Sequence, residues 1–287
     1  MEWPDELVSD IARRKVVIFI GAGVSMNSSG NHNKKPPSWR ELLLKFLEKV
    51  DNPKRHIKSL VNNGDFLTAC EILKKRLGKG TFNSILNEEF SEPNYNPSKI
   101  HELIFKLDSR IVITPNYDKI YDIFATNTDG TIKIKKFNDT DLAETIRRPQ
   151  RIILKIHGSI DNTDDLIFTR SEYAKAKSKQ HNFYKVLESL ILTHTFLFLG
   201  CSLNDPDIKL LLEDYNFRFE SGKKHYLVQA NSNLNIDNIN AVENSLGIKL
   251  LTYRNKDKKH AELQEHLDDL TKKVEEEREH IAITKEW

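Results

Sequence analysis

The feature that most constrains the fold of this chain is a short, uninterrupted apolar run that ends at a glycine. Residues 16–20 read VVIFI, and Gly21-Ala22-Gly23-Val24-Ser25 follows directly. A strand with one face in solvent alternates apolar and polar residues, whereas a run that is apolar at every position is typical of a strand buried on both faces. Because such strands occur in parallel sheets covered by helices on both sides, the run predicts a sheet of that kind.

Further strand-like runs alternate with helical patterns along the rest of the chain. The strand-like segments are 110–114, 131–135, 151–156, 166–169, 195–199, 225–228 and 248–251, and the main helical patterns between them are 117–125, 171–192 and 205–217. Alternation of this kind predicts the α/β class, with a parallel sheet and helices on both of its faces.

Two regions depart from this alternation. From about residue 31 to residue 109 no strand pattern occurs and amphipathic segments are separated by Gly or Pro, which predicts a helical insertion. Residues 258–287 carry leucines and a valine at helical spacing (Leu263, Leu267, Leu270, Val274), which predicts a C-terminal helix that packs on its own domain rather than on a partner. The predicted organisation is one domain over residues 1–257 followed by this helix.

Composition excludes several classes of protein. The 44 basic and 42 acidic side chains nearly balance, so direct binding to nucleic acid is not expected. No apolar segment reaches the roughly 18 residues that a membrane span needs, and the N-terminus does not resemble a secretory signal, which favours the cytoplasm. Only Cys70 and Cys201 occur, too few for a zinc site of four cysteines, and the scattered histidines give no metal site.

Polar residues follow the ends of the first two predicted central strands. In parallel sheets of this kind ligands bind beyond the carboxyl ends of the strands. The glycines of GAGVS can bring backbone amides close to an anion, but Met26 stands where a dinucleotide fingerprint has its third glycine, so a simple tight turn is equally compatible. In TPNYD, Pro115 ends the strand, and Asn116 and Asp118 either project toward a ligand or cap the next helix.

Two later strands end in a similar way. His157-Gly158-Ser159 follows RIILKI, and an imidazole at a strand end can accept a proton near neutral pH, although a single histidine is more often a core residue. GCSLNDPD follows TFLFL and offers Gly200, a hydroxyl and backbone amides to a phosphate or ribose; Asp205 before Pro206 is also an ordinary helix N-cap.

Taken in order, GAGVS, TPNYD, IHGS and GCSLNDPD resemble the sirtuin family and its bacterial SIR2-like branch over nearly the whole chain, from about Lys15 to Tyr253. The resemblance implies a sirtuin-type, Rossmann-like sheet that binds NAD in an extended pose and breaks its nicotinamide–ribose bond. It also implies roles for individual residues. Asn116, Asp118 and His157 would be catalytic, and NAD would be contacted by Gly21, Ala22, Gly23, Ser25, Trp39, Thr114, Gly200, Ser202 and Leu203.

The chain also departs from the protein-deacylating sirtuins. It lacks the paired cysteines of their zinc ribbon, and Pro36-Pro37-Ser38-Trp39-Arg40 stands where they carry a different motif. The Pro-Ser-Trp form resembles SIR2-like defence effectors, in which water is the acceptor and NAD is hydrolysed to nicotinamide and ADP-ribose during phage infection. A protein deacylase and a module that binds NAD or ADP-ribose without turnover stay open as alternatives; a classical dehydrogenase fits least.

Three points are left open by the sequence. Asp118 either favours the cationic transition state or fixes its loop, and we expect the loop role because Asx side chains commonly bond local backbone. Contacts to adenine are undetermined, with Asn231 and Tyr253 near the last strands. Because an unrestrained NAD hydrolase is toxic to its host, and little chain extends beyond the catalytic domain, the resemblance implies control by homo-oligomerisation or by a co-encoded partner such as a HerA-type ATPase.

Overall fold

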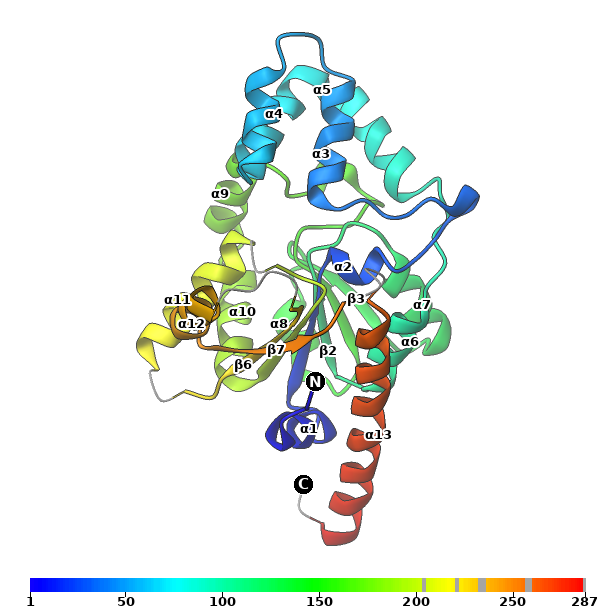
Figure 1. The fold of residues 1–287 in the computed structure, drawn as a ribbon, viewed down its shortest axis with the longest axis vertical. Helices are drawn as coiled ribbons and strands as arrows, with labels where there is room; N and C mark the ends of the chain where they lie inside the picture. The colour runs from blue at the N-terminus through cyan, green and yellow to red at the C-terminus, as the bar shows by residue number, and fades with distance from the viewer. Residues whose placement is uncertain (203–204, 220–221, 232–235, 256–259, 286–287) are drawn as a thin grey trace.

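The computed structural model describes residues 1–202, 205–219, 222–231, 236–255 and 260–285. Within these residues seven strands form one parallel sheet in the order β3-β4-β2-β1-β5-β6-β7 (Figure 1). The strands are β1 (Val16–Ile20), β2 (Ile111–Thr114), β3 (Lys133–Lys136), β4 (Ile152–Lys155), β5 (Thr195–Leu199), β6 (His225–Ala230) and β7 (Ile248–Tyr253). The predicted α/β class and parallel sheet are confirmed.

Helices cover both faces of the sheet, as predicted. Residues Val16, Ile18 and Ile20 of β1 belong to the core on one face, while Val17 and Phe19 belong to the core on the other. The first core is closed by α1 (Asp5–Ala12), α6 (Lys99–Lys106), α7 (Ile120–Thr128) and α13 (Ala261–Thr284), and the second by α8 (Leu142–Arg147), α9 (Arg170–Lys179), α10 (His181–Thr193), α11 (Pro206–Arg218) and α12 (Ile236–Leu246). The apolar character of β1 at every position follows from this burial.

A third layer lies beyond the carboxyl ends of the strands. Helices α3 (Trp39–Glu48), α4 (Arg55–Asn62) and α5 (Phe66–Phe90) form a separate apolar cluster at the top of Figure 1. Helix α5 is kinked at Gly78, whose φ of 71° is in the left-handed region. By contrast α6, which also lies within the predicted insertion, packs against α13 beside the sheet. The boundary of the insertion at residue 109 remains a prediction.

The order of the strands creates one point where neighbouring loops diverge. Strand β1 lies between β2 and β5, and the chain fills the β2 side before it crosses to β5. The segment after β1 leads through the insertion to α6 on one face, whereas the segment after β5 leads to α11 on the other. In open α/β sheets, ligands bind in the crevice at such a switch point. The motifs GAGVS and GCS are therefore at the position where a ligand is expected.

Two predicted elements are wrong. Residues 166–169 form no strand, because their backbone groups are bonded elsewhere: the Tyr117 hydroxyl donates to the Ile167 carbonyl at 2.6 Å, and the amides of Phe168 and Thr169 donate to the Glu172 carboxylate. The single helix expected over 171–192 is two, α9 and α10, which are separated at Gln180.

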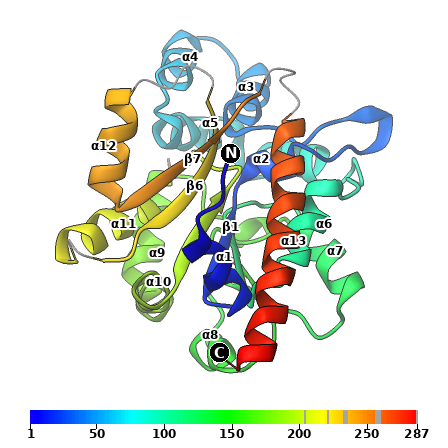
Figure 2. The ribbon, with the colours of Figure 1, turned by 60° about the horizontal axis from the view of Figure 1, so that its bottom comes forward.

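The C-terminal helix packs on its own domain, as the sequence predicts. Leu263, Leu267, Leu270 and Val274 are all buried in the core that α13 shares with α1 and α6 (Figure 2). Among the described residues, no helix has the length and apolar character that crossing a membrane requires.

Candidate functional site

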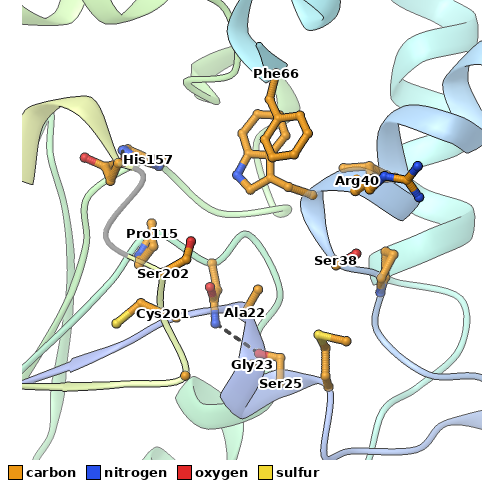
Figure 3. Close-up of a pocket in the computed structure, with 18 of the residues that line it drawn as sticks. Ala22, Gly23, Ser25, Ser38, Arg40, Phe66, Pro115, His157, Cys201 and Ser202 are labelled. Atoms are coloured by element: carbon orange, nitrogen blue, oxygen red, sulfur yellow. Dashed lines mark hydrogen bonds and ion pairs between the residues drawn. The ribbon is translucent and has the colours of Figure 1, made fainter. Parts of the chain in front are cut away.

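A cavity of about 800 Å³ lies between the carboxyl ends of the central strands and the helical insertion. Figure 3 shows Ala22, Gly23 and Ser25 on its lower side, Phe66 on its upper side, and His157 and Arg40 on opposite sides. Its volume is within the range of roughly 300–1,000 Å³ that is usual for sites of small ligands and cofactors. The cavity is thus large enough for a nucleotide.

The floor of the cavity is formed by two glycine-containing loops that touch through their backbones. The Gly23 amide donates to the Gly200 carbonyl at 2.8 Å, and the Gly21 amide donates to the Leu199 carbonyl at 2.9 Å. A Cβ on Gly23 would lie 2.8 Å from the Gly200 oxygen, and a Cβ on Gly200, which has φ of 65°, would lie 2.5 Å from the Val24 nitrogen. Glycine is therefore needed at these positions for the loops to meet.

Asn116 is held by a hydrogen-bond chain that crosses the cavity floor. Its Nδ2 donates to Ser25 Oγ at 3.0 Å, and this hydroxyl donates to Asp118 Oδ2 at 2.8 Å (dashed line to Ser25 in Figure 3). Asp118 Oδ1 accepts from the Ile120 amide at the start of α7. Both Asp118 oxygens are engaged inside the protein, which favours the role of fixing the loop over direct contact with a ligand.

A buried ion pair anchors the same loop from behind. Lys155 is the last residue of β4. Its ammonium contacts Asp122 Oδ2 at 2.7 Å and donates to the Asp118 carbonyl at 2.5 Å. Lys155 has no exposed surface, and Asp122 is almost as deeply buried. Burial raises the pKa of Asp122, while the adjacent Lys155 ammonium acts in the opposite direction. The pair and the bond to the Asp118 carbonyl link the end of β4, two residues before His157, to the segment that carries Asn116.

His157 is bonded to two side chains that come from other elements. Its Nε2 lies 3.0 Å from Asp205 Oδ2 and 3.1 Å from the Tyr173 hydroxyl, which itself donates to Asp205 Oδ2 at 3.0 Å. Burial alone would raise the pKa of Asp205, but the His157 ring and the other hydrogen bonds, including one from the Ile208 amide, lower it below its ordinary value. Asp205 is therefore a carboxylate at neutral pH.

An aromatic wall closes the side of the cavity under the insertion. Trp39 is the first residue of α3, and its ring stacks on Phe66 with 6.2 Å between centroids and meets Phe168 edge-on at 5.7 Å. The Ser38 hydroxyl accepts from the Glu41 amide, and Glu41 in turn accepts from the Ser38 amide, which fixes the start of the helix. Trp39 is thus held in the cavity wall by both packing and capping.

The far end of the cavity reaches the loops after β6 and β7. Gln229, Ala230 and Tyr253 line it, and the Tyr253 hydroxyl bonds to His260 Nδ1 at 2.5 Å. Asn231, which was considered as an adenine contact, is exposed and not among the residues that line the cavity, whereas Tyr253 is.

Most of the residues singled out in the sequence meet in this one cavity. It is lined by Gly21, Ala22, Gly23, Ser25, Trp39, Asn116, Asp118, His157, Gly200 and Ser202. Thr114 does not line it; the Thr114 hydroxyl is buried and bonds to the Ile20 carbonyl and the Asn116 amide. Leu203 lies outside the described residues.

Sequence reasoning missed other residues of the cavity wall. Tyr173 lies inside an amphipathic helical pattern and carried no signal of its own. Asp205 was interpreted only as a helix N-cap, a role that its Oδ1 does fill by accepting from the Ile208 amide at 3.0 Å. Phe66, Arg40 and Arg170 also line the cavity. Over the described ranges, no group of three or more His, Cys, Asp or Glu side chains is placed to hold a metal ion.

The fold and the cavity together define a Rossmann-like α/β protein with a nucleotide-sized cavity at the switch point of its sheet. Residues 110–251 match the model of the SIR2-like domain. Together with the relatives below, this match means that the chain belongs to the SIR2-like family.

Curated relatives carry names from the same family. The chain is 30% identical to the NAD(+) hydrolase ThsA of Enterococcus faecium and 23% identical to that of Bacillus cereus strain MSX-D12, over 76% and 77% of this chain and 44% of each relative. It is also 26% identical to Defense-associated sirtuin 2 of Bacillus subtilis, over 72% of this chain and 20% of that relative. The chain thus matches less than half the length of these relatives.

Proposed function

We propose that this protein is an NAD⁺ glycohydrolase that cleaves NAD⁺ with water into nicotinamide and ADP-ribose. The observation that carries the proposal is the convergence of two glycine loops, Asn116 and His157 on one nucleotide-sized cavity at the switch point. The names of the relatives, which are NAD(+) hydrolases, support the same activity.

The cavity offers a separate surface to each part of NAD⁺. The loops at Gly21–Gly23 and Gly200–Ser202 would bind the pyrophosphate, because glycine has no side chain that would keep an anion away from the backbone. The amides of Gly21 and Gly23 already donate to the Leu199 and Gly200 carbonyls, so other donors of these loops would bond the phosphates. Trp39 would cover the nicotinamide ribose from the insertion side. This arrangement would put the scissile bond between Asn116 and His157, which follow the neighbouring strands β2 and β4.

The chemistry needs little beyond this geometry. Nicotinamide in NAD⁺ is already a cationic leaving group, so its departure leaves an oxocarbenium-like ribose, which the site must bind better than the ground state. The Asn116 carboxamide would orient the water or a ribose hydroxyl, since its Nδ2 is fixed on Ser25 and its Oδ1 remains to accept a hydrogen bond. His157 would accept the proton as the new C–O bond forms.

Chromatography of the products tests this proposal. Purified protein incubated with NAD⁺ should release nicotinamide and ADP-ribose in equal amounts, and His157→Ala and Asn116→Ala variants that remain folded should not. Release of nicotinamide only with an acetylated peptide, with O-acetyl-ADP-ribose as product, would instead identify a deacylase. Binding of NAD⁺ without any nicotinamide release would identify a binding module, and cyclic ADP-ribose would mean that adenine replaces water as the nucleophile.

We further propose that the protein acts in the cytoplasm as an NAD-depleting effector of anti-phage defence, and that assembly controls it. The support is the name of the sirtuin relative, which is defence-associated, and the toxicity of an unrestrained NAD hydrolase. Control would come from homo-oligomerisation or from a co-encoded partner such as a HerA-type ATPase. Size-exclusion fractions assayed for NAD⁺ hydrolysis test this: equal specific activity in monomeric and assembled fractions would contradict it.

A further inference from the structure

His157, Tyr173 and Asp205 form a compact polar cluster in the cavity wall, and they come from three parts of the fold. His157 follows β4, Tyr173 lies in α9, and Asp205 precedes α11. Each pair of polar groups is within hydrogen-bond distance, at 3.0 Å for Nε2 to Asp205 Oδ2 and for the hydroxyl to Asp205 Oδ2, and 3.1 Å for Nε2 to the hydroxyl. His157 is only 3% exposed, so these contacts are largely shielded from water.

The charge of Asp205 determines where the proton on His157 sits. An ionised carboxylate only accepts hydrogen bonds, and Asp205 Oδ2 lies 3.0 Å from Nε2. Nε2 must therefore carry the proton. In a neutral imidazole the other nitrogen then has the lone pair, so Nδ1 is the basic atom. The Tyr173 hydroxyl also lies 3.5 Å from Nδ1, but it donates its proton to Asp205 Oδ2 and so leaves the Nδ1 lone pair available to accept a proton.

The two oxygens of Asp205 have different tasks. Oδ1 accepts from the Ile208 amide and caps α11, while Oδ2 accepts from Nε2 of His157 and from the Tyr173 hydroxyl. A residue that only capped the helix would not need its second oxygen turned toward the cavity. The structure thus separates a folding role, which Asn can also fill, from a role that needs a carboxylate.

We propose that Asp205, assisted by Tyr173, is a positioning residue that holds His157 with its proton on Nε2 and leaves Nδ1 to act as the base of the reaction. This inference rests on the proposed NAD⁺ hydrolysis. In that step the water oxygen bonds to C1′ of the ribose, and the electron pair of the C1′–N bond passes to the nicotinamide nitrogen. The water proton passes to Nδ1 and is later released to solvent, and the Asp205 carboxylate stabilises the imidazolium meanwhile.

The variant Asp205→Asn tests this arrangement directly. Asn still caps α11, because its carbonyl oxygen can accept from the Ile208 amide as Oδ1 does. Its NH₂ group, however, takes the place of Oδ2 and donates a hydrogen bond to Nε2 of His157. Nε2 must then be the acceptor, and the proton of the ring must be on Nδ1. In a Ser–His–Asp triad the same exchange lowers kcat about 10⁴-fold by this change of tautomer. Here we expect kcat to fall by about 10²–10⁴-fold with KM for NAD⁺ within about threefold, and the acid limb of the kcat/KM profile to move.

Two other variants sharpen the comparison. Tyr173→Phe removes one donor to Asp205 but keeps the carboxylate, so we expect a smaller loss, about tenfold. Asp129→Asn is the control, because Asp129 also accepts side-chain and backbone hydrogen bonds, from Thr131, but is not among the residues that line the cavity; it should leave the kinetics unchanged. A kcat for Asp205→Asn within threefold of wild type, with an unchanged pH profile, would overturn the inference.

Nitrogen NMR of the histidine rings gives a readout that does not depend on activity. The His157 signals are assigned by their absence in His157→Gln, and circular dichroism establishes that each variant is folded. We expect the Nε2–H form in the wild type and the Nδ1–H form in Asp205→Asn; the Nδ1–H form in the wild type would refute the assignment. Absence of NAD⁺ turnover by the wild type would refute the proposed function, while this spectrum would still test the tautomer.

Discussion

Replacement of Ser25 by alanine distinguishes two roles for this residue. The family resemblance assigns Ser25 to the pyrophosphate, whereas in the structure its hydroxyl accepts from Asn116 and donates to Asp118. Ser25 and Asp118 are both buried, at 4% and 5% exposure. The variant Ser25→Ala therefore removes the link that orients Asn116 and leaves one oxygen of a buried carboxylate without this donor.

The expected loss of stability follows from that geometry. A hydrogen bond to a charged group contributes about 1.5–3 kcal/mol, so the free energy of unfolding should fall by about 2 kcal/mol. For a domain somewhat smaller than this chain, 1 kcal/mol shifts Tm by roughly 2–4 °C, which gives a decrease of roughly 4–8 °C. The control Ser84→Ala removes a hydroxyl that bonds Glu88 on the surface, and its effect should stay within about 0.5 kcal/mol.

Kinetics and binding then separate the two roles. If Ser25 acts by orienting Asn116, kcat should fall by about 10–100-fold, because a small misplacement of a catalytic group is costly, while KM and the affinity for ADP-ribose change by less than about threefold. If Ser25 bonds the pyrophosphate instead, the loss of about 1.5–3 kcal/mol appears as ADP-ribose binding weaker by about 10–100-fold. Calorimetric titration with ADP-ribose that gives the second result would refute the positioning argument.

Further predictions concern the buried charges and the C-terminal helix. Lys155→Met should lower the free energy of unfolding in urea by about 3–5 kcal/mol, because it leaves the Asp122 carboxylate buried without its cationic partner. Adding Asp122→Leu should recover most of that loss, and no recovery would contradict the ion-pair explanation. The lowered pKa of Asp205 contributes stability above about pH 4 that is lost as the pH falls through its native value, so Asp205→Asn should be less stable than wild type at pH 7, and the difference should shrink as the pH falls below about 4; a pH-independent gap in urea titrations would disprove this. Leu267→Ala should cost about 2–5 kcal/mol by the same assay, since the side chain is fully buried, and a cost below 1 kcal/mol would mean that α13 does not pack on the domain in solution.

The fold was predictable where local pattern and burial coincide. The run 16–20 is apolar at every position because it forms the central strand, covered on both faces, and the stripe from Leu263 to Val274 lies on one side of a helix. The segment 166–169 misled the prediction because it is apolar for a different reason. Leu166 and Phe168 pack under the insertion and Ile167 packs in the core on one face of the sheet, while the backbone of the segment is bonded by Tyr117 and Glu172. Periodicity does not register those side-chain partners.

The candidate site was predictable at strand ends and not inside helices. His157 and Asn116 stand directly after apolar strands, so their position in the chain alone put them at the rim of the sheet. Tyr173 reaches the same cavity from the middle of a helical pattern, where an aromatic residue usually means core. The second task of Asp205 could not be read from sequence either, because N-capping already accounts for an Asp before Pro206.

The central claim, that this cavity binds NAD⁺ with the scissile bond at Asn116 and His157, is tested most directly by a crystal structure of the Asn116→Ala variant soaked with NAD⁺. We expect intact NAD⁺ in the cavity, with the pyrophosphate on the Gly21–Gly23 loop and the nicotinamide ribose between Trp39 and His157. NAD⁺ bound in the opposite direction, with adenine at His157, or bound outside the cavity, would refute the proposed site.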